Sequence, residues 1–259
     1  ADGYHLLQTV FQFIDRCDWL YFEPRRDGAI RRGAELDGIS PEHDLALRAA
    51  RLLREETGVA WGVDIRIDKR LPIGGGLGGG SSDAATTLLA LNRLWALDLP
   101  VARLAELGLR LGADVPVFVQ GHAAWAEGVG ERLTPISLDE PWYVVLVPPV
   151  RVSTAEVFGA PELTRNADPI KINDFLSGQC VNACESVVCV RYPEVAEAVH
   201  WLSRRGTARV TGTGACVYAA FPDQAQARSV LAQVPQPLQG FVARGLNRSP
   251  VLARLARER

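Results

Sequence analysis

The sequence predicts an α+β fold of two domains, and three observations lead to this prediction. Strand and helix patterns of apolar residues follow one another through the first part of the chain. A glycine-rich segment joins one predicted strand directly to a helix. Beyond a polar, proline-containing stretch, a shorter series of helix, strand, strand, helix and strand is typical of a two-layer sandwich. We therefore expect a first domain over 1–135 and a second over 136–259.

The N-terminal part is expected to form strands around one helix. Residues 6–23 mix aromatic and β-branched side chains, which predicts a strand. Leucine and alanine recur at helical spacing over 44–56, and Gly58 marks the end of that helix. Over 63–67, valine and isoleucine alternate with charged residues, which predicts a strand with one exposed face.

Two helices are expected after the glycine-rich segment. Ser82 or Asp83 is suited to cap the N-terminus of the first helix. Its apolar side chains recur at helical spacing, at Ala84, Leu88, Leu91 and Trp95. The second helix is predicted over 101–111 and is stopped by Gly112-Ala113-Asp114-Val115-Pro116.

The rest of the chain is expected to change its organisation around a linker. Strands are predicted over 123–126 and 142–147, before Pro148-Pro149 and the polar stretch 159–174. The elements predicted beyond it are a helix over 195–203, a strand leading into Gly212-Thr213-Gly214, a strand over 215–221, a helix over 223–234 and a strand over 241–244.

Composition argues against several classes of protein. The 28 basic and 30 acidic residues give a net charge of −2, which favours neither nucleic acid nor an anionic membrane. No apolar run approaches the ~20 residues of a membrane span, and no signal peptide is visible. We expect a cytoplasmic protein that is a monomer or a weak homodimer. The sequence contains no methionine, so we also expect that the true N-terminus lies upstream of Ala1.

The cysteines and histidines do not predict a metal site. The five cysteines form no C-x-x-C pair. Cys180, Cys184 and Cys189 could be imagined as ligands, but we interpret all five as reduced, packed side chains. His122 and His200 are interpreted as structural.

The glycine-rich segment is the strongest indication of function. Six of the seven residues from Gly74 to Gly80 are glycine, and Ser81 and Ser82 follow. Such a run costs backbone entropy, which a chain tolerates where side chains would block a close approach to the backbone. Because a helix begins here, its free N–H groups and its dipole favour an anion. We expect a phosphate chain at this position; the alternative is a flexible linker or a tight packing turn.

Two common phosphate-binding motifs fit this segment poorly. Gly74, Gly76 and Gly79 match G-x-G-x-x-G, but the next element is a helix rather than the strand and acidic residue of a dinucleotide-binding fold. Gly75 and Gly80 have the spacing of a P-loop, but serine stands where that motif needs lysine. The D-F-G and H-R-D sequences of protein kinases are also missing.

Two separate glycine motifs resemble those of the GHMP kinases, the superfamily that includes galactokinase, homoserine kinase and mevalonate kinase. The segment from Pro72 to Ser82 resembles their ATP-phosphate loop, and Thr211-Gly212-Thr213-Gly214-Ala215-Cys216 resembles their second glycine motif. The resemblance implies that the two motifs lie against each other. It also implies an S5-like N-terminal domain and a ferredoxin-like C-terminal domain.

Further segments narrow the resemblance to the 4-diphosphocytidyl-2-C-methyl-D-erythritol kinase family. They are Ala1-Asp2-Gly3-Tyr4-His5, Gly112 to Pro116, Gly121-His122-Ala123-Ala124, Glu127-Gly128-Val129-Gly130-Glu131 and Thr211 to Cys216. The match is looser over 25–42 and 160–190. The resemblance implies ATP-dependent phosphorylation of the 2-hydroxyl of a CDP-linked methylerythritol in the non-mevalonate route to isoprenoid precursors. The alternatives are another small-alcohol kinase of the superfamily and a nucleotide-binding module without turnover.

The resemblance also implies roles for particular residues. Asp114 would be the base for the attacking hydroxyl, and its partner lysine, in a P-A-K-[IL]-N segment, is expected upstream of Ala1. Tyr4 and His5 would recognise the cytidine, and Phe158 would cover its other face, with Thr154 and Val129 nearby. The residues expected to bind ATP are Asp44, Leu45, Lys69, Pro72, Ile73, Gly74, Gly75, Gly76, Leu77, Gly78, Gly79, Gly80, Ser81 and Ser82, supported by Gly212, Thr213 and Gly214.

Two details of the nucleotide site follow from the same resemblance. Lys69 would lie near the adenine. Asp44 stands where the family often has asparagine, and its carboxylate can accept a hydrogen bond but cannot donate one. ATP is expected to bring Mg²⁺, which keeps most of its water and needs few protein ligands.

Overall fold

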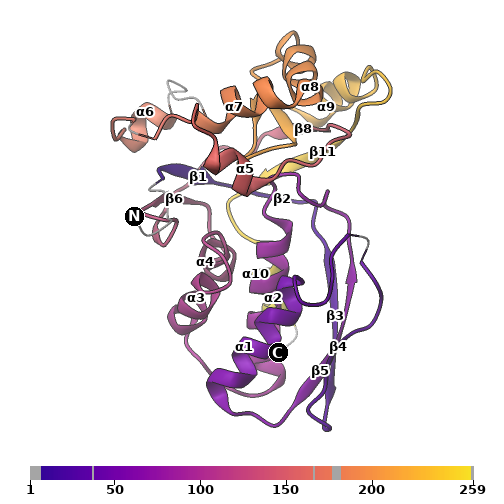
Figure 1. The fold of residues 1–259 in the computed structure, drawn as a ribbon, viewed down its shortest axis with the longest axis vertical. Helices are drawn as coiled ribbons and strands as arrows, with labels where there is room; N and C mark the ends of the chain where they lie inside the picture. The colour runs from indigo at the N-terminus through magenta and orange to yellow at the C-terminus, as the bar shows by residue number, and fades with distance from the viewer. Residues whose placement is uncertain (1–6, 37, 166, 177–181, 258–259) are drawn as a thin grey trace.

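The computed structural model describes residues 7–36, 38–165, 167–176 and 182–257, and shows two halves, one above the other in Figure 1. The lower half contains the N-terminal helices and one sheet. The upper half contains a second sheet with helices on its outer side. In these described ranges no helix is long and apolar enough to cross a membrane.

The sheet of the lower half has three strands in the order β3 (Trp19–Arg25), β5 (Gly62–Asp68) and β4 (Ile30–Arg32). β3 pairs with β5 in antiparallel orientation, and β4 pairs with β5 in parallel orientation. The apolar residues of β5 are buried and Arg66 is exposed. The alternation predicted over 63–67 is therefore confirmed.

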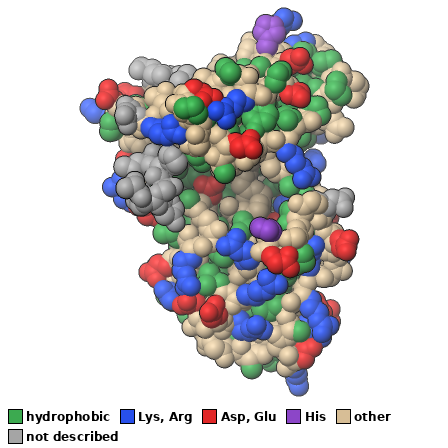
Figure 2. All heavy atoms as spheres, in the orientation of Figure 1, with side chains coloured by type: hydrophobic (Ala, Val, Ile, Leu, Met, Phe, Trp, Pro, Cys, Tyr) green, Lys and Arg blue, Asp and Glu red, His purple; other side chains and the backbone are tan. Residues whose placement is uncertain are grey.

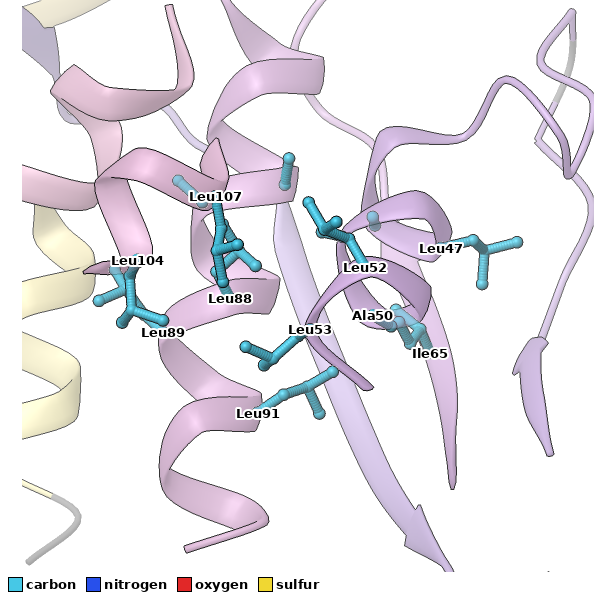
Figure 3. Packing of buried hydrophobic residues seen from close by; sticks show 14 of the residues in the cluster. Leu47, Ala50, Leu52, Leu53, Ile65, Leu88, Leu89, Leu91, Leu104 and Leu107 are labelled. Atoms are coloured by element: carbon cyan, nitrogen blue, oxygen red, sulfur yellow. The ribbon is translucent and has the colours of Figure 1, made fainter. Parts of the chain in front are cut away.

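The other layer of the lower half includes the helices α1 (Leu45–Thr57), α2 (Gly79–Leu94), α3 (Val101–Leu109) and α4 (Val115–Gln120). Helix α1 ends at Thr57, next to the predicted Gly58, which is its C-cap in a left-handed conformation. Figure 3 shows leucines of α1, α2 and α3 pointing toward one another beside Ile65 of β5. This cluster is the core that holds the start of α2 in place.

The upper half is built on an antiparallel sheet with the order β2 (Phe13–Ile14), β11 (Gln239–Leu246), β8 (Trp142–Val147), β10 (Val217–Phe221) and β9 (Arg209–Val210). Its helices are α5 (Thr154–Gly159), α6 (Ile172–Leu176), α7 (Ala183–Arg191), α8 (Pro193–Ser203) and α9 (Gln224–Leu231). A second apolar cluster lies between the sheet and α7, α8 and α9. The expected two-layer sandwich is present.

Segments from both ends of the chain cross between the halves. A small sheet, β1 (Thr9–Phe11), β6 (Ala124–Glu127) and β7 (Arg132–Pro135), lies where the halves meet. The last helix, α10 (Pro250–Arg257), returns to the lower half, where Val251 and Leu255 pack on its core. The C-terminal helix thus belongs structurally to the N-terminal core.

Several predicted boundaries were wrong. The single strand expected over 6–23 is three strands, because β1, β2 and β3 pair with three different partners. Helix α2 begins at Gly79, before the serines, and its N-cap is Gly78 without a side-chain capping bond. Neither Ser82 nor Asp83 is therefore the cap. The elements that the sequence did not predict are β4, β7, α4, α5, α6, α7 and α10.

Candidate active site

The two glycine motifs meet between the halves. The amides of Ala215 and Cys216 donate to the carbonyl oxygens of Gly74 (3.4 Å) and Gly75 (3.1 Å). The hydroxyl of Thr211 donates to the carbonyl of Gly76 at 3.0 Å, across 135 residues of sequence. The predicted contact between the motifs is confirmed.

Gly76 shows why this contact needs glycine. Its φ is +73°, and a Cβ here would collide with the carbonyl oxygen of Thr211 and lie 2.8 Å from that of Gly214. Any side chain would push the two motifs apart. The glycine-rich segment is therefore a packed loop and not a flexible linker; this contact is equally that of the tight packing turn that the sequence also left open, so the phosphate site stays a prediction.

Other residues expected to bind the nucleotide lie in the same loop or beside it. Leu45 lies beside its end, since a Cβ on Gly80 would be 3.4 Å from Cδ1 of Leu45. Leu77 packs with buried Cys216 under the upper sheet. Pro72, Ile73, Ser81 and Ser82 are all partly accessible along the loop and the first turn of α2.

Asp44 has a structural task that the sequence did not indicate. One oxygen accepts from the amides of Ala46 (2.9 Å) and Leu47 (3.4 Å) and caps α1. The other oxygen pairs with Arg32 at 3.2 Å, and both side chains are almost fully buried. Its expected contact with the adenine stays a prediction.

Asp114 sits at the N-terminus of α4 without acting as its cap. Its side chain makes no capping hydrogen bond, although a cap is the ordinary role of an aspartate there. Burial raises the pKa of Asp114, and no charged neighbour among the described residues opposes this shift. Ala113 contacts Gly130 closely, and Ser81 lies beside Gly112, so Asp114 is placed near the start of α2. An uncommitted carboxylate of raised pKa is suited to accept a proton.

Lys69 lies in a buried cluster whose other members the sequence did not identify. Its ammonium donates to Asp18 at 2.5 Å and to Asp83 at 2.8 Å. Burial raises the pKa of Asp83 to about 7, despite the lowering effect of Lys69. Burial lowers the pKa of Lys69, but Asp83 and Asp18 outweigh it and the pKa stays above its ordinary value. The partners are 51 and 14 residues from Lys69, so no local pattern indicates them.

The residues expected to bind the cytidine are only partly placed. The hydroxyls of Thr154 and Thr213 are 3.0 Å apart, which puts the start of α5 on the second glycine motif. Phe158 is partly buried against the upper core, and Val129 is partly exposed beyond β6. Tyr4 and His5 lie outside the described residues, as does Cys180.

Gln8 is a further residue near this region that the sequence did not single out. Its amide donates to Glu127 at 2.9 Å and exchanges hydrogen bonds with the backbone of Ile170. The ring of Phe175, in α6, contacts Trp125 edge-on at 5.6 Å between centroids. These contacts hold the segment before α6, and α6 itself, against Gln8 and β6. Only the side-chain pairings, not the sequence spacing, reveal this.

Together these groups can hold a phosphate chain and accept a proton. Figure 2 shows the surface hollowed between the two halves, the region where the motifs meet. Within the described residues, no group of three or more histidine, cysteine or acidic side chains is arranged to hold a metal ion.

Two protein-family models match this chain, one in each half. The model described as "GHMP kinases N terminal domain" matches residues 44–122, and "GHMP kinases C terminal" matches 162–240. A protein of Nitrosococcus oceani named 4-diphosphocytidyl-2-C-methyl-D-erythritol kinase is 57% identical over 97% of this chain and 90% of its own length. One of the same name from Thiobacillus denitrificans is 59% identical over 96% of this chain and 90% of its own length.

Solved structures agree with this similarity. A crystal structure of 4-(cytidine 5'-diphospho)-2C-methyl-D-erythritol kinase is 32% identical, covers 94% of this chain and 91% of its own, and has a TM-score of 0.81. A mevalonate kinase structure has a TM-score of 0.70 at 16% identity, covering 95% of this chain and 93% of its own. At that identity the second likeness shows the fold alone.

Proposed function

The chain belongs to the 4-diphosphocytidyl-2-C-methyl-D-erythritol kinases within the GHMP kinases, and from this we infer that it is an ATP-dependent small-molecule kinase. It phosphorylates the 2-hydroxyl of 4-(cytidine 5′-diphospho)-2-C-methyl-D-erythritol in the non-mevalonate route to isoprenoid precursors. The predicted α+β GHMP-kinase fold is confirmed by the same relatives.

The observation that best supports this function is the packed pair of glycine motifs beside an uncommitted carboxylate. The loop from Pro72 to Ser82 offers backbone N–H groups at the start of α2, where the helix dipole favours phosphate. Asp114 lies at the start of the neighbouring helix α4 with no capping bond to occupy it. Phosphoryl transfer needs mainly this positioning and charge stabilisation.

In the proposed reaction, the 2-hydroxyl oxygen attacks the terminal phosphorus of ATP. The bond from that phosphorus to the bridging oxygen breaks, and the hydroxyl proton passes to Asp114. Because burial raises the pKa of Asp114, the carboxylate is a stronger base than an exposed aspartate. The lysine expected upstream of Ala1 stays a prediction.

We propose that Mg²⁺ accompanies ATP. Mg²⁺ prefers oxygen ligands and commonly takes one or two carboxylates together with phosphates. The hydroxyl of Ser81, in the first turn of α2, is an oxygen donor that would hold Mg²⁺ beside the phosphates, while Asp114 keeps its carboxylate free to accept the proton. When bound, Mg²⁺ would neutralise charge on the phosphates.

The substrate is tested with the full-length protein by following ADP formation with several alcohols. We expect turnover with the CDP-linked methylerythritol and none with mevalonate, homoserine or galactose. Turnover with one of those three alone would favour another GHMP kinase. ATP binding without turnover of any alcohol would favour a nucleotide-binding module.

We also propose that the enzyme works in the cytoplasm as a monomer or weak homodimer. Cys17, Cys184, Cys189 and Cys216 are unpaired thiols, which suits a reducing compartment. Sedimentation at micromolar concentration would check the assembly state, and a stable tetramer would contradict it.

A further inference from the structure

A buried group of three charged side chains lies below the glycine loop. We name Asp18, Lys69 and Asp83 the loop-base triad. Their side chains are 2%, 14% and 7% exposed. Asp18 precedes β3 and Lys69 follows β5; since the ladder ends at the pair Trp19 and Asp68, these two residues occupy the positions just beyond its end. Asp83 comes from the second turn of α2. The triad therefore joins the start of β3 and the end of β5 to helix α2. The glycine loop connects β5 to that helix.

Asp18 uses both of its carboxylate oxygens. Oδ2 accepts from Nζ of Lys69 at 2.5 Å. Oδ1 accepts from the amides of Arg70 at 2.6 Å and Leu71 at 2.8 Å. Leu71 immediately precedes the loop, so Asp18 fixes the direction in which the chain enters it.

Asp83 is held differently, although it shares the same lysine. Among the described residues, its side chain makes one hydrogen bond, from Nζ of Lys69 to Oδ2. An asparagine at 83 could accept that bond through its amide oxygen. An asparagine at 18 has one acceptor atom, so it must lose either Lys69 or the two backbone amides.

Lys69 also contacts the far end of the loop, at Gly79. A Cβ placed on Gly79 would lie 3.2 Å from Nζ of Lys69 and 3.5 Å from Oδ2 of Asp18. The ammonium of Lys69 thus packs against Gly79, the first residue of α2. Two of its three donors are used by the carboxylates.

We propose that Asp18 is a positioning residue for the nucleotide. By holding the amides before the loop and the lysine beneath its end, it keeps the loop in the shape that receives the phosphate chain. This inference rests on the proposed function, because it takes the loop to be the ATP-phosphate site. It assigns Asp18 no contact with ATP or the alcohol.

The test compares Asp18→Asn with Asp83→Asn as a matched pair. Each variant leaves Lys69 with one carboxylate, so the buried group becomes a neutral ion pair and both chains should fold. For Asp18→Asn we expect a KM for ATP and a Kd for ADP raised about tenfold or more, while the KM for the CDP-linked alcohol changes less than about twofold. For Asp83→Asn we expect all three constants to stay within about threefold of wild type.

Two results would overturn the inference. One is that the KM for ATP and the Kd for ADP are the same in Asp18→Asn and Asp83→Asn. The other is a similar rise of both KM values in Asp18→Asn, which indicates general loss of structure instead of nucleotide positioning. If Asp18→Asn fails to fold, Asp18→Glu keeps both oxygens but displaces them by one methylene. An unchanged KM for ATP in that variant would equally overturn the inference.

Calorimetry with ADP separates this inference from the proposed function. A wild-type protein that does not bind ADP contradicts the proposed function itself. A wild-type protein that binds ADP, with Asp18→Asn binding it equally well, contradicts only the role of Asp18.

Discussion

Burial disfavours the charged form of the Asp83 carboxylate. Its pKa is raised to about 7 by burial, and its charged neighbours are Lys69, Asp18 and Asp44. In the unfolded chain an aspartate titrates near its ordinary value of 3.8. The folded protein therefore binds this proton more tightly than the unfolded chain does.

The sign of the pH effect follows from this difference. The contribution of Asp83 to stability is fully present below about pH 4 and is lost as pH rises through about 7. Relative to wild type, Asp83→Asn should therefore become more stable as pH rises from 5 to 8, by more than ~1 kcal/mol across that range. Urea denaturation at several pH values measures this. The prediction is contradicted if the free energy of unfolding changes with pH by the same amount in both proteins.

Single residues also show what the sequence can and cannot predict. The glycine run was predicted because its residue types carry the signal locally, whereas Asp114 was singled out only through the family resemblance. The loop-base triad was not, because its bonds span 51 and 14 residues and depend on the register of β3 with β5. Tertiary pairing of this kind is not encoded in any local window.

At the level of elements, the contact between the two glycine motifs decides the shape of the site. Gly76 and Gly74 both have φ near +70°, at +73° and +72°. A Cβ on Gly76 would collide with the second motif, whereas a Cβ on Gly74 meets nothing within 4 Å. The two positions share their backbone strain and differ only in packing.

This difference predicts contrasting effects of two alanine variants. Gly76→Ala should weaken ATP binding at least ~10-fold, because the motifs must separate, and lower the free energy of unfolding by ~2–4 kcal/mol. Gly74→Ala should cost only the strain of a positive φ, ~1 kcal/mol. ATP titration and urea denaturation of both variants check this. Equal losses would show that packing between the motifs is unimportant.

Element boundaries were less predictable than element types. The chain from 6 to 23 has one continuous strand pattern, yet it serves three sheets in turn. The sequence suggested Ser82 or Asp83 as the cap of α2, but the tertiary contacts of the glycine loop start the helix at Gly79. In both cases packing partners, not local preference, set the boundary.

For the whole molecule, the main feature is that the last described helix returns from the upper sheet to the lower half, whose core is built from the N-terminal helices. Helix α10 follows β11 of the upper sheet and packs Val251 and Leu255 on the lower core. Leu252 fills the space beside Gly121, 2.7 Å from where a Cβ would be. A division of the chain by sequence alone would place α10 with the C-terminal domain.

This packing predicts that α10 stabilises the lower half. The double variant Val251→Ala, Leu255→Ala should lower the free energy of unfolding by ~1–3 kcal/mol, because apolar surface is exposed. Leu94→Ala is the matched control, since Leu94 is 46% exposed and should cost less than ~0.5 kcal/mol. The same urea midpoint for both proteins would mean that α10 does not support this core.

The central claim, that Asp114 is the base of an ATP-dependent phosphoryl transfer, is tested most directly by the turnover of Asp114→Asn with ATP and the CDP-linked methylerythritol. Asparagine keeps the size of the side chain but cannot accept the hydroxyl proton. We expect kcat to fall by ~10²-fold or more while the affinity for ATP changes little. Near-normal turnover in Asp114→Asn would contradict the role of Asp114, and with it this account of the reaction.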